Sequence, residues 1–342
     1  MTERHLDVVP LTMRLMDIDS TSGHEGAVIE WLERYLAGAN WNTRRIPVTP
    51  GRDDLLATSG DIPTVTLSTH LDTVPPYIPP RLDGPVLWGR GACDAKGIAA
   101  SMIIAAERLR ATGVAVALLF VVGEETTHDG AEAANRVPTT SKVLINGEPT
   151  ESTLAIGTKG AMRFTLRTHG VSAHSAYPHL GRSAITDLVQ LLHDLDRVKL
   201  PRDADLGDTT INIGLISGGV ADNVLAPVAE ARLMARLVTP PETLMTLLRD
   251  WVGDRAAIEF GITVELARLN VVPGFLTSVV AFATDIPKLP TWGTPYLFGP
   301  GSINAAHRDD EHVKVADLHA AVDAYTKLAT LALQAATRAG SA

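Results

Sequence analysis

The uninterrupted apolar run from Val114 to Val122 constrains the fold of this 342-residue chain more than any other feature. The run is too short to cross a bilayer, which needs roughly 18 or more apolar residues. Polar and apolar side chains do not alternate within it, which is typical of a parallel strand covered on both faces. Gly123, Glu124 and Glu125 follow directly. The sequence therefore predicts an α/β sheet with two carboxylates just past the end of a buried strand.

Two further segments place polar side chains at strand ends. Residues 64–69 predict a strand that leads to His70 and Asp72, and residues 143–146 predict another that leads to Glu148. Ligand sites of open α/β sheets lie at the carboxyl ends of the strands. Three strands are therefore expected to deliver candidate ligands to the same edge of the sheet.

The pattern changes after about Gly157, and the chain is long enough for two domains. Before this point, helical spacing of apolar residues predicts helices at 22–38 and 97–109. Beyond it, strands and helices are predicted in the order βαββαβ, typical of a small α+β sandwich, at residues 159–168, 181–197, 209–216, 229–238, 241–252 and 262–267. A strand at 279–282 and a terminal helix from Val315 follow. We expect a discontinuous first domain, residues 1–156 and 269–342, interrupted by an inserted domain, residues 157–268.

Composition narrows the classes of function. The formal net charge is −9 and there is no basic block, which argues against nucleic acid or an anionic membrane as a partner. The N-terminal residues lack the apolar segment of a secretory signal, and no stretch is apolar enough for a membrane span. The single cysteine, Cys93, excludes an intramolecular disulfide. A cytoplasmic enzyme is the resulting prediction.

Each chemical motif has a structural alternative when it is considered alone. His70 and Asp72 suit a metal ligand with a carboxylate that orients its ring, but a surface histidine beside a turn has the same pattern. Asp94 lies among glycines before a helix, so it can bridge two cations or simply cap the helix. Glu124 and Glu125 can divide the roles of base and ligand, or form a solvated strand end.

The order of five motifs discriminates among these alternatives. Asn146-Gly147-Glu148-Pro149-Thr150 supplies another strand-end carboxylate, and the Gly-rich segment 299–311 carries His307. His-x-Asp, a Gly-bounded Asp, Gly-Glu-Glu, Gly-Glu-Pro and a late Ala-His with acidic residues follow one another along the chain. With this series the sequence resembles the zinc-dependent M20 peptidase family over nearly its whole length. The resemblance implies a mixed-sheet zinc-peptidase fold (phosphorylase/hydrolase-like) with an inserted α+β dimerisation domain.

The resemblance also implies a two-zinc centre. Asp94 matches the carboxylate that bridges the metals, His70 and Glu148 would complete one site, and Glu125 and His307 would complete the other. Two imidazoles and three carboxylates suit Zn2+, and Co2+ or Mn2+ are plausible substitutes.

Three more residues receive catalytic roles from the resemblance. Glu124 matches the general base that takes a proton from the attacking water and passes it to the leaving amine, and Asp72 matches the carboxylate behind His70. His174 matches a histidine that reaches the partner subunit's active site and can stabilise the oxyanion, which predicts a homodimer through the inserted domain. A loop histidine on a solvated turn is the alternative for His174, and His179 is its nearest competitor.

The substrate contacts are predicted on the same grounds. Asn223 matches the family's Asn-Val element, and Arg236 matches an arginine that holds the substrate carboxylate. Arg232 is the rival of Arg236, and an exposed strand arginine is the alternative for both. Asp309, Asp310 and Glu311 are expected to support the site or cap a helix. The histidines without a partner pattern, for which no role is predicted, are His24, His128, His169, His193, His312 and His319.

The predicted reaction is hydrolysis of the amide bond of an N-acyl amino acid. Within the family, the Gly-Glu-Pro-Thr element and the late histidine loop are closest to the acetylornithine deacetylase and succinyl-diaminopimelate desuccinylase branch. A carrier-linked lysine or ornithine hydrolase, and a dipeptidase, aminopeptidase or carboxypeptidase of the same fold, are the alternatives. A non-catalytic binding homologue would require the loss of a ligand, and none of the five is lost.

Overall fold

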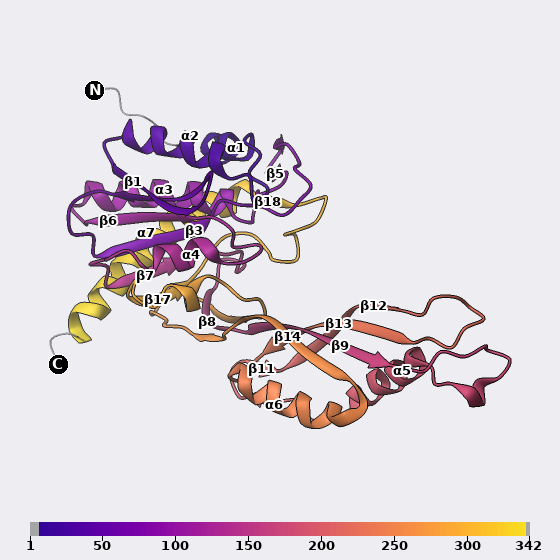
Figure 1. Cartoon of the computed structure of the whole chain (residues 1–342). Helices are drawn as coiled ribbons and strands as arrows, with labels where there is room; N and C mark the ends of the chain where they lie inside the picture. The colour runs from indigo at the N-terminus through magenta and orange to yellow at the C-terminus, as the bar shows by residue number, and fades with distance from the viewer. Residues whose placement is uncertain (1–6, 340–342) are drawn as a thin grey trace. The chain divides into compact units, whose positions relative to one another are not determined.

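The computed structural model describes residues 7–339, and these residues form two compact units (Figure 1). Of these residues, the first unit comprises 7–156, 269–278 and 284–339, and the second comprises 157–268 and 279–283. The fold class predicted from the sequence, α/β with an inserted α+β unit, is confirmed.

The first unit is built on a six-stranded mixed sheet with the strand order β1-β2-β6-β3-β7-β17. Strands β6, β3, β7 and β17 are parallel, whereas β1 and β2 form an antiparallel hairpin at one edge. The strands of this sheet are β1 (Asn42–Thr49), β2 (Arg52–Thr58), β3 (Val65–His70), β6 (Val116–Val121), β7 (Val143–Asn146) and β17 (Thr294–Leu297). A small antiparallel sheet contains β4 (Arg81–Asp83), β5 (Val86–Trp88) and β18 (His312–Lys314).

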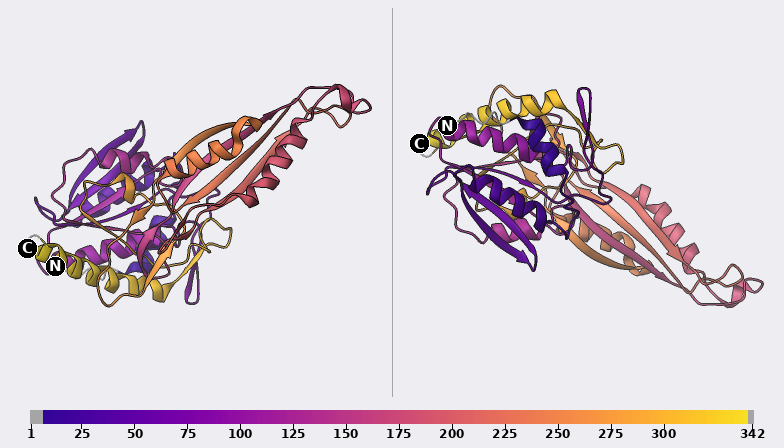
Figure 2. Two further views of the ribbon diagram at one scale, coloured as in Figure 1. Left: turned by 90° about the horizontal axis from the view of Figure 1, so that it is seen from below. Right: turned by 90° about the horizontal axis from the view of Figure 1, so that it is seen from above.

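Helices cover both faces of the large sheet, which explains why β3, β6 and β7 are fully buried and why β6 is apolar throughout. One face packs against α1 (Val8–Met16), α2 (Gly26–Ala37), α3 (Lys96–Ala111) and α7 (Val315–Ala339). Figure 2 shows α3 and α7 side by side along this face. The other face packs against α4 (Asp129–Ala134) and the segment that contains the short helix η4 (Ile286–Lys288). Among the described residues, no helix is long and apolar enough to cross a membrane.

The second unit has a four-stranded antiparallel sheet in the order β12-β13-β9-β14. One face carries the apolar core with α5 and α6, and the other face carries charged side chains. The main elements, in the predicted βαββαβ order, are β9 (Gly160–His169), α5 (Ala184–Asp194), β12 (Thr210–Gly218), β13 (Val228–Leu237), α6 (Pro241–Val252) and β14 (Ala257–Val264). The minor elements are η1 (Pro178–Leu180), η2 (Leu195–Arg197), β10 (Arg202–Asp203), β11 (Gly207–Asp208), η3 (Gly253–Arg255) and β15 (Ala267–Arg268). Strands β8 (Leu154–Thr158) and β16 (Thr277–Val280) lie where the chain passes from one unit to the other.

One predicted strand is misplaced. Residues 262–267 were expected to form the last strand of the inserted domain, but β14 runs from Ala257 to Val264. Its pairing with β9 shifts register between Phe260 and Thr263, so the alternation of side chains breaks inside the strand. The sequence therefore shows a recognisable strand pattern only in the second half of β14, which is why the predicted strand begins too late.

Candidate metal centre

The side chains predicted as ligands lie together at one edge of the large sheet. His70 ends β3, Glu125 follows β6 after the turn that begins at Gly123, and Glu148 follows β7. Three parallel strands therefore present polar groups at their carboxyl ends, as expected for an α/β sheet. Asp94 comes from the loop before α3, and the long loop after β17 brings His307 to the same place.

Asp94 is the centre of this cluster. Its Oδ1 lies 3.0 Å from Nε2 of His70, and its Oδ2 lies 3.3 Å from Nε2 of His307. The same Nε2 of His307 lies 2.9 Å from the carboxylate of Glu125. The ligand atoms of His70, Asp94 and Glu125 all lie within 4.8 Å of one another, which is close enough to hold a metal ion. The two oxygens of one carboxylate thus face two different imidazoles.

Glu148 supplies an independent sign that a cation belongs here. Its side chain is buried, and its Oε1 has no hydrogen-bond partner among the described residues. Burial raises the pKa of Glu148 well above its usual range, although the charge of His70 opposes this shift. An unpartnered buried carboxylate oxygen is costly unless a cation or a proton compensates it. The donor set of carboxylates and imidazoles therefore fits a divalent transition-metal ion such as Zn2+.

The electrostatics of the neighbouring groups agree with that fit. Burial raises the pKa values of Glu124 and Glu125, and other carboxylates nearby raise them further. Hydrogen bonds with Asp94 and Glu125 raise the pKa of His307 to about 10. Burial would lower the pKa of His70, but hydrogen bonds with acidic neighbours raise it instead. The buried carboxylates of this cluster outnumber the positive charges near them, and a bound cation would balance them.

Asp72 lies beside His70 and also holds the turn that follows β6. Nδ1 of His70 makes its closest contact, 2.9 Å, with the main-chain oxygen of Asp72, while the carboxylate lies 3.5 Å away. The Asp72 carboxylate instead accepts hydrogen bonds from the main-chain N–H groups of Glu124 and Glu125 and from the Ser22 hydroxyl. Burial would raise the pKa of Asp72, but these partners and His70 hold it below its usual range. Asp72 therefore joins the end of β3 to the turn after β6.

Glu311 performs the corresponding task for the Asp94 loop. Its carboxylate forms a buried ion pair with Arg90 at 2.6 Å and accepts hydrogen bonds from the main-chain N–H groups of Gly91, Cys93 and Asp94. The loop that carries His307 is thus bonded to the loop that carries Asp94. The supporting role predicted for Glu311 fits this arrangement, whereas Asp310 forms an exposed pair with Arg308.

His128, for which the sequence shows no partner pattern, has two acidic neighbours in the structure. Nδ1 of His128 lies 2.8 Å from Oδ1 of Asp285 and 3.8 Å from Oε1 of Glu124. Ligand atoms of these three residues lie within 4.8 Å of one another. The sequence hid this contact because Asp285 lies 157 residues after His128.

The remaining predicted residues belong to the second unit, where His174 and Asn223 are neighbours. His174 pairs with Val224 in an isolated bridge, and the N–H of Ser175 donates to the main-chain oxygen of Asn223. The N–H of Ala176 donates to Nδ1 of His174 at 3.1 Å. A neutral imidazole whose Nδ1 accepts carries its proton on Nε2, so exposed His174 presents a donor.

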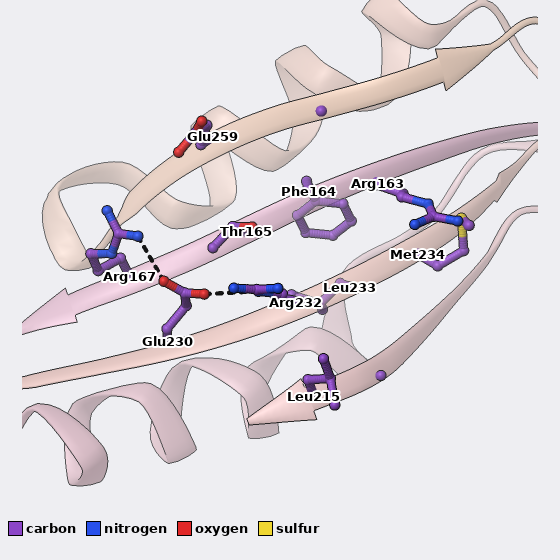
Figure 3. Close-up of a pocket in the computed structure, with 12 residues that line it drawn as sticks. Arg163, Phe164, Thr165, Arg167, Leu215, Glu230, Arg232, Leu233, Met234 and Glu259 are labelled. Carbon is purple, nitrogen blue, oxygen red and sulfur yellow. Dashed lines mark hydrogen bonds and ion pairs between the residues drawn. The ribbon is translucent and has the colours of Figure 1, made fainter. Parts of the chain in front are cut away.

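The charged face of the second sheet distinguishes the two candidate arginines. Figure 3 shows a groove across β9, β13 and β14, in which Glu230 bonds to both Arg167 and Arg232. Arg236 has no carboxylate partner among residues 7–339; burial lowers its pKa, and the charge of nearby Arg163 lowers it further. Arg236 is therefore better suited than Arg232 to accept an anion.

Comparison with known proteins agrees with this fold. Residues 156–259 match the model of a peptidase dimerisation domain. The chain is 37% identical to a peptidase M20 domain-containing protein of Schizosaccharomyces pombe, covering 94% of this chain and 84% of that protein. It is 36% identical to a probable carboxypeptidase of Aspergillus fumigatus, covering 93% of this chain and 85% of that protein.

Solved structures share the fold at lower identity. A tripeptidase of Staphylococcus aureus superposes with a TM-score of 0.80 at 19% identity, covering 95% of this chain and 98% of the other. An M20 family metallo-carboxypeptidase of Sulfolobus solfataricus gives 0.75 at 16% identity, covering 95% and 99%. Fold and relatives together define a metallopeptidase-like hydrolase. The chain belongs to the M20 peptidase family.

Proposed function

We propose that this protein uses two divalent cations to hydrolyse the amide bond that precedes a residue with a free α-carboxylate. The main support for this proposal is the position of Asp94, whose two oxygens face the imidazoles of His70 and His307. A carboxylate in this position can give one oxygen to each of two cations. His70 and Glu148 would hold one cation, and Glu125 and His307 the other.

The reaction would divide among a few side chains. Two cations, in the simplest case Zn2+ with Co2+ or Mn2+ as substitutes, would polarise the scissile carbonyl and acidify the attacking water. Glu124 would accept the proton of that water and return it to the leaving amine. His174 would donate its Nε2–H to the oxyanion, while Arg236 and Asn223 would bind the substrate carboxylate and its surroundings.

The first candidate substrate is the C-terminal residue of a short peptide. The Aspergillus relative's description as a probable carboxypeptidase supports it, and so does the lack of a carboxylate partner for Arg236 among the described residues. The second candidate is an N-acyl amino acid, as in acetylornithine deacetylase and succinyl-diaminopimelate desuccinylase. Both substrate classes present the same chemistry, an amide whose amine side carries a free carboxylate.

The second unit would join two copies of the chain, as its match to a dimerisation domain suggests. Strand β12 is one of the two edge strands of its sheet, and Leu215 and Ile216 on it are 63% and 58% exposed. Helix α5 adds exposed Ile185 and Val189. An unpaired strand edge with large exposed apolar side chains favours association with a second edge of the same kind.

The decisive experiment compares matched substrates with the zinc-loaded enzyme. The panel contains dipeptides, N-acetyl and N-succinyl amino acids, and each compound again with its carboxylate converted to a carboxamide. We expect amine release from the free acids and at least a hundredfold lower kcat/KM for the carboxamides. Equal hydrolysis of acids and carboxamides would contradict the proposal, and release from the N-acyl amino acids alone would favour the second candidate.

A further inference from the structure

A buried group of three side chains lies beside the metal centre and is not part of it. Nδ1 of His128 faces two carboxylates, at 2.8 Å from Asp285 and at 3.8 Å from Glu124. His128 and Asp285 are 7% and 1% exposed, so water does not screen these contacts effectively. None of the three belongs to the set of five residues proposed to hold cations.

The turn after β6 places His128 beside Glu124. The main-chain N–H groups of Thr127 and His128 both donate to the oxygen of Gly123, and His128 has a φ of +56°. Asp72 fixes the main chain of Glu124 through its N–H. Within residues 7–339, the one basic side chain within 4.0 Å of the Glu124 carboxylate is that of His128.

Asp285 holds the imidazole of His128 through the same nitrogen, Nδ1, that faces Glu124. Its main-chain oxygen accepts from the N–H of Lys288 at the start of η4, so the residue is fixed in the structure. Its Oδ1 contacts His128, and its Oδ2 has no hydrogen-bond partner among the described residues. A buried carboxylate with one partner is costly to keep, which points to a use for that partner.

We propose that His128, held by Asp285, is the positioning residue for the general base Glu124, a proposal that rests on the function proposed above. Glu125 is the next residue and faces Asp94 and His307, so a Glu124 side chain that turned the same way would become a ligand. The Glu124 carboxylate lies on the side of His128 instead, 3.8 Å from Nδ1. Glu124 thereby stays free to accept a proton from the attacking water.

The first test removes the imidazole without straining the turn. Glycine adopts a φ of +56° readily, so His128→Gly keeps the backbone and deletes the side chain. We expect kcat to fall by about tenfold to a hundredfold, because small misplacements of a catalytic group have effects of this size. The KM should stay within about twofold of wild type, and two zinc ions per chain should remain bound. Added imidazole should restore at least part of the lost kcat.

A matched control separates positioning from a general effect of losing a histidine. His319 is exposed and lies 3.9 Å from the carboxylate of Asp7. His319→Ala should keep the wild-type kcat, with or without imidazole. Unchanged kcat in His128→Gly, or a loss that imidazole does not relieve, would overturn the proposal.

A double-mutant cycle tests whether His128 acts through Glu124. In the Glu124→Gln background, His128→Gly should cause no further fall in kcat beyond about twofold, because the group it positions is already gone. Multiplicative losses would overturn the proposal. A third zinc equivalent that binds to wild type and is lost in His128→Gly would also overturn it, since the three side chains would then form a cation site.

A spectroscopic readout does not depend on turnover. In zinc-loaded protein labelled with 15N-histidine, the ring signal absent from His128→Gly belongs to His128. That signal should shift in Glu124→Gln and in Asp285→Asn, and remain unchanged in Glu30→Gln, a change at an exposed residue that pairs with Arg34. No shift in Glu124→Gln would overturn the proposal. If no substrate is hydrolysed, the proposed function fails, but the effect of Glu124 on the His128 ring signal can still be measured. If His128→Gly does not fold, Asp285→Asn provides the kcat comparison.

Discussion

The carboxylate of Asp72 accepts a hydrogen bond from the main-chain N–H of Glu124 at 3.1 Å. Its other oxygen accepts from the N–H of Glu125 at 3.2 Å. One buried side chain at the end of β3 therefore fixes the backbone of the turn after β6. Since Glu124 is the proposed base and Glu125 a proposed ligand, this contact sets the spacing between the two roles.

Replacement of Glu124 by glutamine should abolish turnover without loss of metal. The amide keeps the shape of the side chain but cannot accept the proton of the attacking water. We expect kcat to fall by roughly two to four orders of magnitude. Metal analysis should still give two zinc ions per chain. A mutant that lacks one zinc would show that Glu124 is a ligand.

Asp94→Ala and His307→Ala should differ in the metal they retain. Asp94 presents one oxygen to each side of the centre, so its removal should disturb both cation sites. His307 contacts only one side, so its removal should empty mainly one. Zinc titration by calorimetry measures the two sites separately. Loss of one and the same site in both variants would contradict the bridging role of Asp94.

Glu311→Gln should destabilise the protein. The substitution leaves Arg90 charged and buried, and its other guanidinium nitrogen, Nη2, already has no hydrogen-bond partner within residues 7–339. Breaking such a pair lowers the free energy of unfolding by about 3 kcal/mol. Urea unfolding of the zinc-loaded protein measures the effect. Asp310→Asn, in an exposed pair with Arg308, is the control and should change stability by less than about 1 kcal/mol.

The buried carboxyl of Asp54 should make stability depend on pH. Burial, and then the charges of Asp285 and Asp129, raise its pKa to about 8, while the N–H of Val122 opposes the shift. The folded chain therefore binds a proton that the unfolded chain has released above about pH 4, so this contribution to stability is lost as pH rises toward 8. Asp54→Asn keeps the acceptor for Val122 and should flatten the fall of unfolding free energy between pH 5 and pH 8. The same slope in wild type and variant would refute the assignment; exposed Asp323→Asn is the control.

A homodimer in which His174 serves the partner's site should show complementation between inactive chains. In a mixed dimer of His174→Ala and Glu124→Gln, one site has both an intact Glu124 and an intact His174. With random exchange about half of the dimers are mixed, so roughly a quarter of wild-type sites should recover, given twofold pairing. Absence of recovery after demonstrated subunit exchange would place His174 in its own chain's site or in none.

The parts of the fold that the sequence predicts best are those buried on both faces. The predicted strand at 115–122 and the helix at 97–109 differ from β6 and α3 by one or two residues at their ends. The hairpin β1–β2 was missed because β1 is an edge strand with mostly exposed polar side chains, so no apolar pattern marks it. Edge strands depend on their neighbours for their structure, and a local pattern does not contain that information.

The residues of the candidate site also differ in how well the sequence predicts them. His70, Glu125 and Glu148 were found because each directly follows a recognisable strand, whereas His307 and Asp94 gained meaning from the order of all the motifs. The partnership of His128 with Asp285 could not be predicted, because Asp285 lies in a segment whose pattern suggests only the start of a short helix. Two residues so far apart become neighbours only through the packing of α4 and η4 on the same face of the sheet.

The parallel pairing of β17 with β7 has a consequence for synthesis of the chain. The second unit is encoded almost wholly between these two strands, so the ribosome completes residues 157–268 before it makes β17. We expect the second unit to fold on the ribosome first, while the first unit still exposes the unpaired edge of β7. The surface proposed for pairing with a second copy would then form before the candidate metal centre is complete.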